Sequence, residues 1–105
     1  MANTFKSYPS AGITTETTVY TGPASTEATV IGMTIANTTA SNLTCSVKVS
    51  DGSTTVFLIK DATILPGGAL IPVGGDQKVV IEASDTLLVS ATGAVDCLVS
   101  VLEIS

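Results

Sequence analysis

The sequence predicts a single all-β domain: a β-sandwich of about seven to nine short antiparallel strands with almost no helix. Runs rich in Val, Ile, Leu and Thr recur along the chain at intervals of roughly 8–12 residues. Turn residues, chiefly Gly, Pro, Asn and Asp, separate these runs. No stretch combines helical spacing of apolar residues with helix caps. The topology stays open at this point between jelly-roll and immunoglobulin-like.

The stretch 64–92 shows this pattern most densely. Pro66-Gly67-Gly68 and Gly74-Gly75-Asp76 are turn signals, because glycine accepts positive φ and proline presets φ. The polar residues 82–85 have the length of a hairpin tip. The strands predicted here are 69–73, 78–83 and 86–91.

The run 43–50 is the clearest strand, because apolar and polar residues alternate along it with period two. Asp51-Gly52-Ser53 after it predicts a hairpin turn that leads into a partner strand at 54–60. Further strands are expected at 17–20, 28–36 and 95–104. The predicted core is Ile31, Met33, Ile35, Leu43, Cys45, Val47, Val49, Val79, Ile81, Cys97, Val99 and Val101.

Residues 1–16 are polar, and Pro9 and Gly12 interrupt any regular element. We therefore divide the chain into an N-terminal arm, 1–16, and a sandwich domain, 17–105. The arm packs on a neighbouring subunit or is simply a frayed terminus.

Composition excludes several classes of function. The net charge is −5 and arginine is absent, which argues against a nucleic-acid partner. No apolar run approaches the length of about 18 residues that a membrane span needs. The start lacks the pattern of a secretory signal, and the initiating Met1 favours synthesis in the cytoplasm. Charged residues make up only 12%, which is typical of a protein that works inside an assembly.

The reactive side chains predict no catalytic, cofactor-binding or metal-binding residue. Histidine is absent, so no Ser-His-Asp or Cys-His arrangement can form. Cys45 and Cys97 lie in Val-rich runs and are expected to be buried free thiols rather than a bridge. Glu82 and Asp85 could form an acid pair, but a solvated turn is far commoner. Asp51, Asp76 and Asp85 lie in turns without the spacing of a calcium loop. We therefore expect a protein that is not an enzyme and has no cofactor.

Two predicted strands, 54–60 and 95–104, carry apolar residues on both faces. Coverage on both sides by the same chain would explain this, but a chain with few strands and no helix has little with which to cover a second face. We therefore expect a homo-oligomer, because apolar patches of this kind mark partner surfaces. The expected interface residues are Phe57, Leu58, Leu98, Leu102 and Ile104. We expect them to form one patch, with Phe57 or Leu58 beside the three residues of the last strand.

Several motifs resemble a family of small virion structural proteins of tailed bacteriophages. They are MANTFKSY at 1–8, TVYTGP at 18–23, VIGMTIANT at 30–38, IPVGGDQKVV at 71–80 and LVSVLEI at 98–104. The resemblance implies a virion location and a role as a capsid decoration or cement protein that binds the major capsid protein. It also suggests a trimer, since many capsid-coating proteins sit on three-fold positions. It leaves open a position at the head, neck or tail.

The alternative is a neck, tail or fibre component that binds a receptor or a glycan. Glycan sites usually offer exposed aromatic side chains, and aromatic residues make up only 4% of this sequence. The sequence therefore favours the decoration protein.

Overall fold

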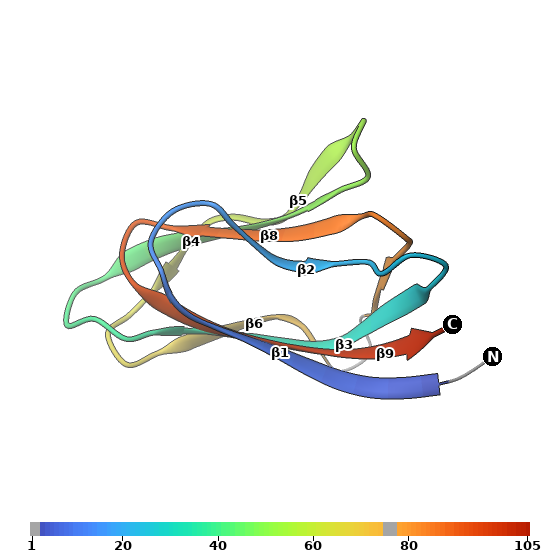
Figure 1. Cartoon of the computed structure of the whole chain (residues 1–105). Coiled ribbons are helices and arrows are strands. Elements are labelled where there is room, and N and C mark those ends of the chain that lie inside the picture. Colours follow the sequence, from blue (N-terminus) through green and yellow to red (C-terminus); the bar gives the residue numbers. More distant parts are fainter. Residues whose placement is uncertain (1–2, 75–77) are drawn as a thin grey trace.

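The computed structural model describes residues 3–74 and 78–105, and these form a β-sandwich of nine strands without a helix (Figure 1). The all-β sandwich predicted from the sequence is confirmed. No helix in the described ranges is long and apolar enough to cross a membrane. The strands are β1 (Asn3–Ile13), β2 (Thr17–Thr21), β3 (Glu27–Asn37), β4 (Leu43–Ser50), β5 (Thr55–Ile64), β6 (Ala69–Val73), β7 (Val79–Ile81), β8 (Thr86–Ala91) and β9 (Val95–Ile104).

The strands pair as nested hairpins. β1 pairs with β9, β2 with β8, β3 with β6 and β7, and β4 with β5, all antiparallel. Successive pairs alternate between two sheets. The first sheet has the order β1-β9-β3-β6 with β7 also on β3, and the second has the order β2-β8-β4-β5. This arrangement is a jelly roll, and it resolves the topology that the sequence left open.

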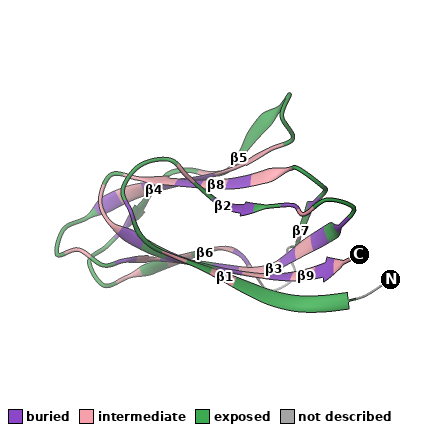
Figure 2. Cartoon of the chain, viewed as in Figure 1, coloured by how far each residue is buried: buried purple, intermediate pink, exposed green. Residues whose placement is uncertain are grey.

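The core lies between the sheets, and its buried residues come from strands of both sheets (Figure 2). Most of the predicted core is confirmed as buried, while Val49 and Val79 are half-buried and pack against it. Ile31 is wrong. A bulge between Val30 and Gly32 shifts the alternation of β3, so Val30 is fully buried and Ile31 is only half-buried.

The hairpin of β4 and β5 is confirmed, with Ser50 opposite Thr55 at its end. The carboxylate of Asp51 organises the turn, because its Oδ1 accepts the N–H groups of Ser53 and Thr54 at 2.9 and 2.7 Å. Hydrogen bonds from the Thr54 and Ser53 N–H groups lower the pKa of Asp51. Gly52 takes a φ of 94°, which favours glycine.

The hairpin predicted around 82–85 is wrong, because β7 belongs to the first sheet and β8 to the second. The residues between them form a tight turn from one sheet to the other. The Asp85 N–H donates to the Glu82 carbonyl at 3.1 Å, and the Glu82 N–H donates to Asp85 Oδ2 at 3.1 Å. The turn predicted at 74–76 lies partly outside the described residues.

The N-terminal arm also differs from expectation, because residues 3–13 form the edge strand β1 of the first sheet rather than a separate segment. An edge strand tolerates Pro9, since one side of its backbone needs no partner. Gly12, with a φ of 65°, lies in the irregularity between Ser10 and Ile13, where the register shifts. Most of β1 is exposed (Figure 2), which explains its polar sequence.

Both cysteines are buried free thiols, as predicted. Burial raises the pKa of the Cys45 thiol to about 11 and that of the Cys97 thiol to about 12. The neighbouring Cys45 makes a smaller contribution to the shift of Cys97. The thiolate, not the thiol, is the nucleophile. Neither sulfur is therefore poised for chemistry at neutral pH.

Candidate interaction surface

The outer face of the first sheet brings apolar side chains from two strands together. In an antiparallel pair, residues directly opposite each other project from the same face. Leu102 of β9 lies opposite Phe5 of β1, and Leu98 lies opposite Pro9. The inner positions of β9 are buried, so these residues and Ile104 project outward. We call Phe5, Pro9, Leu98, Leu102 and Ile104 the apolar face.

The apolar face is largely open to solvent. Phe5 is 73% exposed and Leu98 is 44% exposed, whereas Leu102 and Ile104 are half-buried. Ile71 of β6 and Val80 of β7 belong to the same sheet and are also exposed. Thr29 and Thr34 of β3 lie opposite Leu102 and Leu98. A sheet face with these large apolar side chains is a candidate surface for a partner.

The structure divides the interface residues predicted from the sequence into two groups. Leu98, Leu102 and Ile104 lie together on the first sheet. Phe57 belongs to β5 in the second sheet, on the other side of the sandwich (Figure 1). Leu58 is partly buried and packs against the core. The expectation that Phe57 or Leu58 lies beside the β9 residues is therefore wrong.

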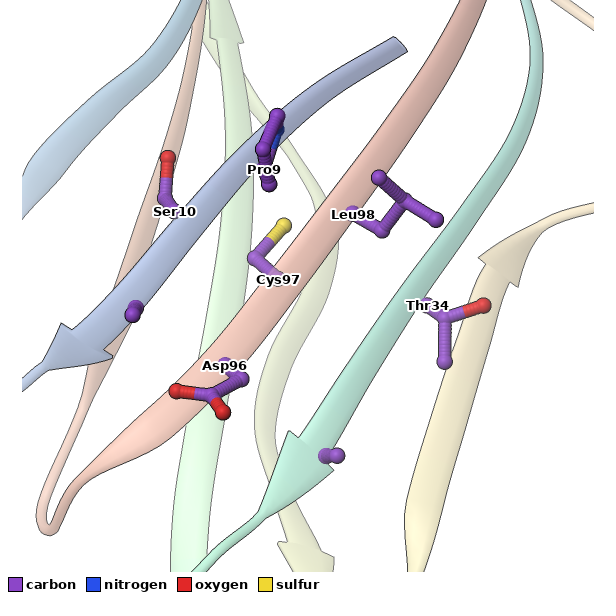
Figure 3. A pocket seen from close by; sticks show the side chains of 8 residues that line it. Pro9, Ser10, Thr34, Asp96, Cys97 and Leu98 are labelled. Carbon is purple, nitrogen blue, oxygen red and sulfur yellow. The ribbon is translucent and has the colours of Figure 1, made fainter.

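An open trough crosses the apolar face near Leu98 (Figure 3). Its volume is about 610 Å³. Figure 3 shows Pro9, Leu98 and Thr34 on three neighbouring strands, with Asp96 further along β9. Oδ1 of Asp96 accepts a hydrogen bond from the Gly12 N–H at 3.0 Å. The lining residues are Pro9, Ser10, Ala11, Thr34, Ala36, Asp96, Cys97 and Leu98.

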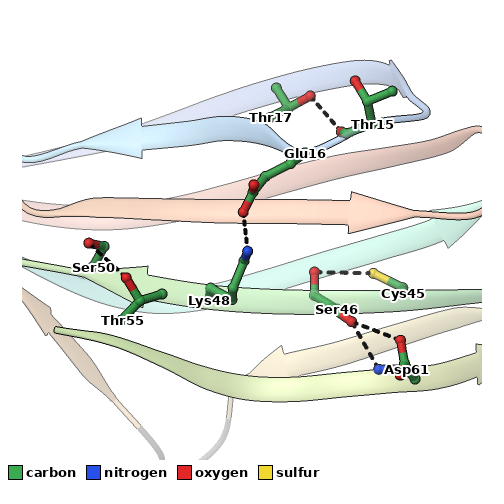
Figure 4. A network of polar contacts seen from close by, with 9 residues as sticks. All are labelled: Thr15, Glu16, Thr17, Cys45, Ser46, Lys48, Ser50, Thr55 and Asp61. Carbon is green, nitrogen blue, oxygen red and sulfur yellow. Dashed lines mark hydrogen bonds and ion pairs between the residues drawn. The ribbon is translucent and has the colours of Figure 1, made fainter. Parts of the chain in front are cut away.

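Phe57 forms a separate feature on the outer face of the second sheet. It lies opposite Lys48 of β4 and is 49% exposed. The ammonium nitrogens of Lys48 and Lys60 lie 5.6 and 5.4 Å from the centre of its ring, within the range of cation–π attraction. Lys48 also forms an ion pair with Glu16 (Figure 4). We call Phe57 with Lys48 and Lys60 the Phe57 knob.

A carboxylate lies on the inner side of the strand that carries the apolar face. Glu103 of β9 is only 6% exposed. Its Oε2 accepts hydrogen bonds from the hydroxyl groups of Tyr20 at 2.6 Å and Tyr8 at 2.9 Å, and its Oε1 lies 3.3 Å from Lys6 Nζ. Tyr20 belongs to the second sheet, and Glu103, Tyr8 and Lys6 belong to the first. The cluster therefore joins the two sheets.

The protonation of this cluster follows from its contacts. Burial alone would raise the pKa of Glu103, but the hydrogen bonds from Tyr20 and Tyr8 and the nearby Lys6 outweigh it and lower the pKa. Burial and the neighbouring carboxylate raise the pKa of both tyrosines. Glu103 is thus ionised and both phenols are neutral at pH 7. The sequence analysis did not predict this cluster. The signal for it was Glu103, a single carboxylate among the residues of β9 that alternation places on the buried face.

The other acidic residues considered as catalytic or metal-binding candidates lie in turns. The Asp85 and Asp51 carboxylates accept backbone N–H groups of their own turns, and Glu82 is an exposed residue of the first of these turns. Asp76 lies outside the described residues. Within 3–74 and 78–105, no group of three or more His, Cys, Asp or Glu side chains could hold a metal ion.

No protein-family model matches the chain, and no curated protein matches it. One solved structure is similar in fold. It comes from Bacillus endospore appendages, which are described as a novel family of disulfide-linked pili. The similarity covers 97% of this chain and 84% of the other, with a TM-score of 0.55 and 13% sequence identity. At this identity the likeness shows a shared fold alone.

We predict that Glu103→Gln removes a pH-dependent part of the stability. Because the folded-state pKa of Glu103 is lowered, its stabilisation is complete above the ordinary carboxyl pKa and is lost as the pH falls through the folded value. In urea unfolding followed by circular dichroism, the variant should be less stable than the native chain at pH 7, and the difference should shrink toward pH 3. Tyr20→Phe, which removes one hydrogen bond to a charge, should cost about 1.5–3 kcal/mol at pH 7. An equal deficit of the Gln variant at both pH values would contradict this role.

Proposed function

We propose that this chain is a non-enzymatic structural subunit that associates with copies of itself through the apolar face. The observation that carries the proposal is the exposure of Phe5 and Leu98 beside Leu102 and Ile104 on one sheet face. The sheet already has its core on the other side, so nothing within the described chain covers this face.

The energetics favour a self-associating surface. Burying a large apolar side chain contributes roughly 1.5–3 kcal/mol relative to leaving it exposed. Association costs an estimated 4–15 kcal/mol in translational and rotational freedom, so several such side chains must be buried together. The outward-facing charged residues of β1, β9 and β3 are Glu27, opposite Ile104, and Asp96, in a trough beside Leu98. Both lie toward the ends of the apolar face, away from Phe5 and Leu102 at its centre. Like-charge repulsion between copies is therefore small there.

We further propose that the assembly is a virion of a tailed bacteriophage, with the chain as a head decoration or cement protein. This step rests on the resemblance of the sequence motifs. The partners would be further copies of the chain, with a trimer as the expected form, and the major capsid protein. A small all-β subunit suits such a role, because cementing a particle requires binding surfaces and no reactive group. The aspartates of its turns accept hydrogen bonds from its own backbone.

The protein of similar fold supports a structural subunit of an assembly in general terms, since it comes from appendages that are described as a family of pili. A neck, tail or fibre component that binds a receptor or glycan is the second candidate. The exposed rings of Phe5 and Phe57 are the observation in its favour, but they lie on opposite sheets and cannot stack on one sugar together.

We predict that Leu102→Lys weakens self-association. The substitution places a charge at the centre of the apolar face, next to Phe5, without touching the core. Light scattering across a dilution series should show native oligomers that dissociate on dilution and a variant that stays near 10.5 kDa. Ala83→Lys, an exposed change in the turn between β7 and β8 and outside both sheets, is the matched control and should assemble normally. A native chain that is monomeric at every micromolar concentration would overturn the proposal.

The virion assignment has its own test. Quantitative mass spectrometry of purified particles should find hundreds of copies of the chain per particle if it coats the head. A few to a few dozen copies would instead place it at the neck or tail, against the decoration role. Absence of the chain from purified particles would contradict any virion role.

A further inference from the structure

The interface residues that the sequence predicts as one patch are two patches on opposite sides of the sandwich. One is the trough on the apolar face, and the other is the Phe57 knob. We propose that the Phe57 knob of one copy seats in the trough of a second copy, so that the chains associate head to tail. This inference rests on the self-association proposed above. It names the Phe57 knob as the surface of the second copy that the apolar face binds.

The two patches have complementary shapes. The trough is concave, and its lining is mostly apolar, with the small side chains Ala11 and Ala36 between larger neighbours. Small side chains leave room for an incoming ring. The knob offers such a ring, because Phe57 is half exposed near the β4–β5 hairpin, which projects from the sandwich (Figure 1). Aromatic anchors buried in pockets are what dominates binding energy at interfaces.

The charges of the two patches are complementary. Phe57 is flanked by Lys48, which is paired with Glu16, and by Lys60, two of the four lysines of an acidic chain. The trough carries the exposed carboxylate of Asp96 (Figure 3). With the ring in the trough, the ammonium group of Lys60 can approach this carboxylate. Face-to-face packing of two troughs would instead bring two Asp96 carboxylates toward each other, which is unfavourable.

A contact between two different patches also has a consequence for symmetry. Self-complementary contacts close into two-fold dimers, whereas head-to-tail contacts build rings or open filaments. A trimer therefore requires head-to-tail contacts. The knob and the trough lie on opposite sheets, so each copy can use both at once.

Mixing two interface variants tests the inference. Phe57→Ser removes the knob, and Thr34→Lys places a cation in the trough against the incoming lysines. Both positions are exposed, so both variants should melt cooperatively like the native chain. Each alone should stay near 10.5 kDa, with an apparent Kd raised about tenfold or more. An equimolar mixture retains one intact knob and one intact trough, and should form a complex of about twice that mass and nothing larger. Ala83→Lys is again the control.

The outcomes separate this inference from the proposed function. If Phe57→Ser assembles like the native chain while Leu102→Lys does not, the apolar face binds a copy without the knob, and the head-to-tail contact is overturned. A mixture of the two variants that stays monomeric overturns it as well. A native chain that never associates overturns both proposals.

Discussion

The structure depends on β9, a central strand that is apolar on both faces. Val95, Cys97, Val99 and Val101 fill the inner side and are buried. β1 and β3 hydrogen-bond to its two edges, so the last strand of the chain joins the first strand to the third. This placement closes the nested pairing of the jelly roll. It also leaves Leu98, Leu102 and Ile104 on the outer side, which is the surface that we propose binds a partner.

Polar groups as well as apolar packing hold the edge of the sandwich beside β9. Tyr8 and Tyr20 lie with ring centres 5.0 Å apart and share the carboxylate of Glu103. A buried carboxylate is costly unless it is hydrogen-bonded and paired, and Glu103 has two phenols and Lys6. These contacts fix the edge strand β1 to the second sheet. They thereby position Phe5 and Pro9 on the outer face.

Local patterns predicted most of the strands, the hairpin at Asp51 and much of the core, because period-two alternation and turn chemistry act over a few residues. The prediction of Ile31 as a core residue failed because a bulge shifts the alternation of β3. Strand β1 was not predicted because an edge strand needs few apolar residues. The candidate site was predicted in part. Leu98, Leu102 and Ile104 share a strand, so their common face follows from sequence. Whether Phe57 joins them depends on the division of strands between sheets, which long-range pairing determines.

The central claim is that another copy covers the outer face of β9 and β3 in the assembled state. Thiol labelling of Thr34→Cys tests it most directly, because Thr34 is exposed opposite Leu98 and the native thiols are buried with raised pKa values. The new thiol should react with a maleimide slowly at concentrations where the chain is assembled and rapidly after dilution. Ala83→Cys, in the exposed turn between β7 and β8, should react rapidly at both concentrations. Equally rapid labelling of Thr34→Cys at every concentration, in a chain that light scattering shows to be assembled, would contradict the account.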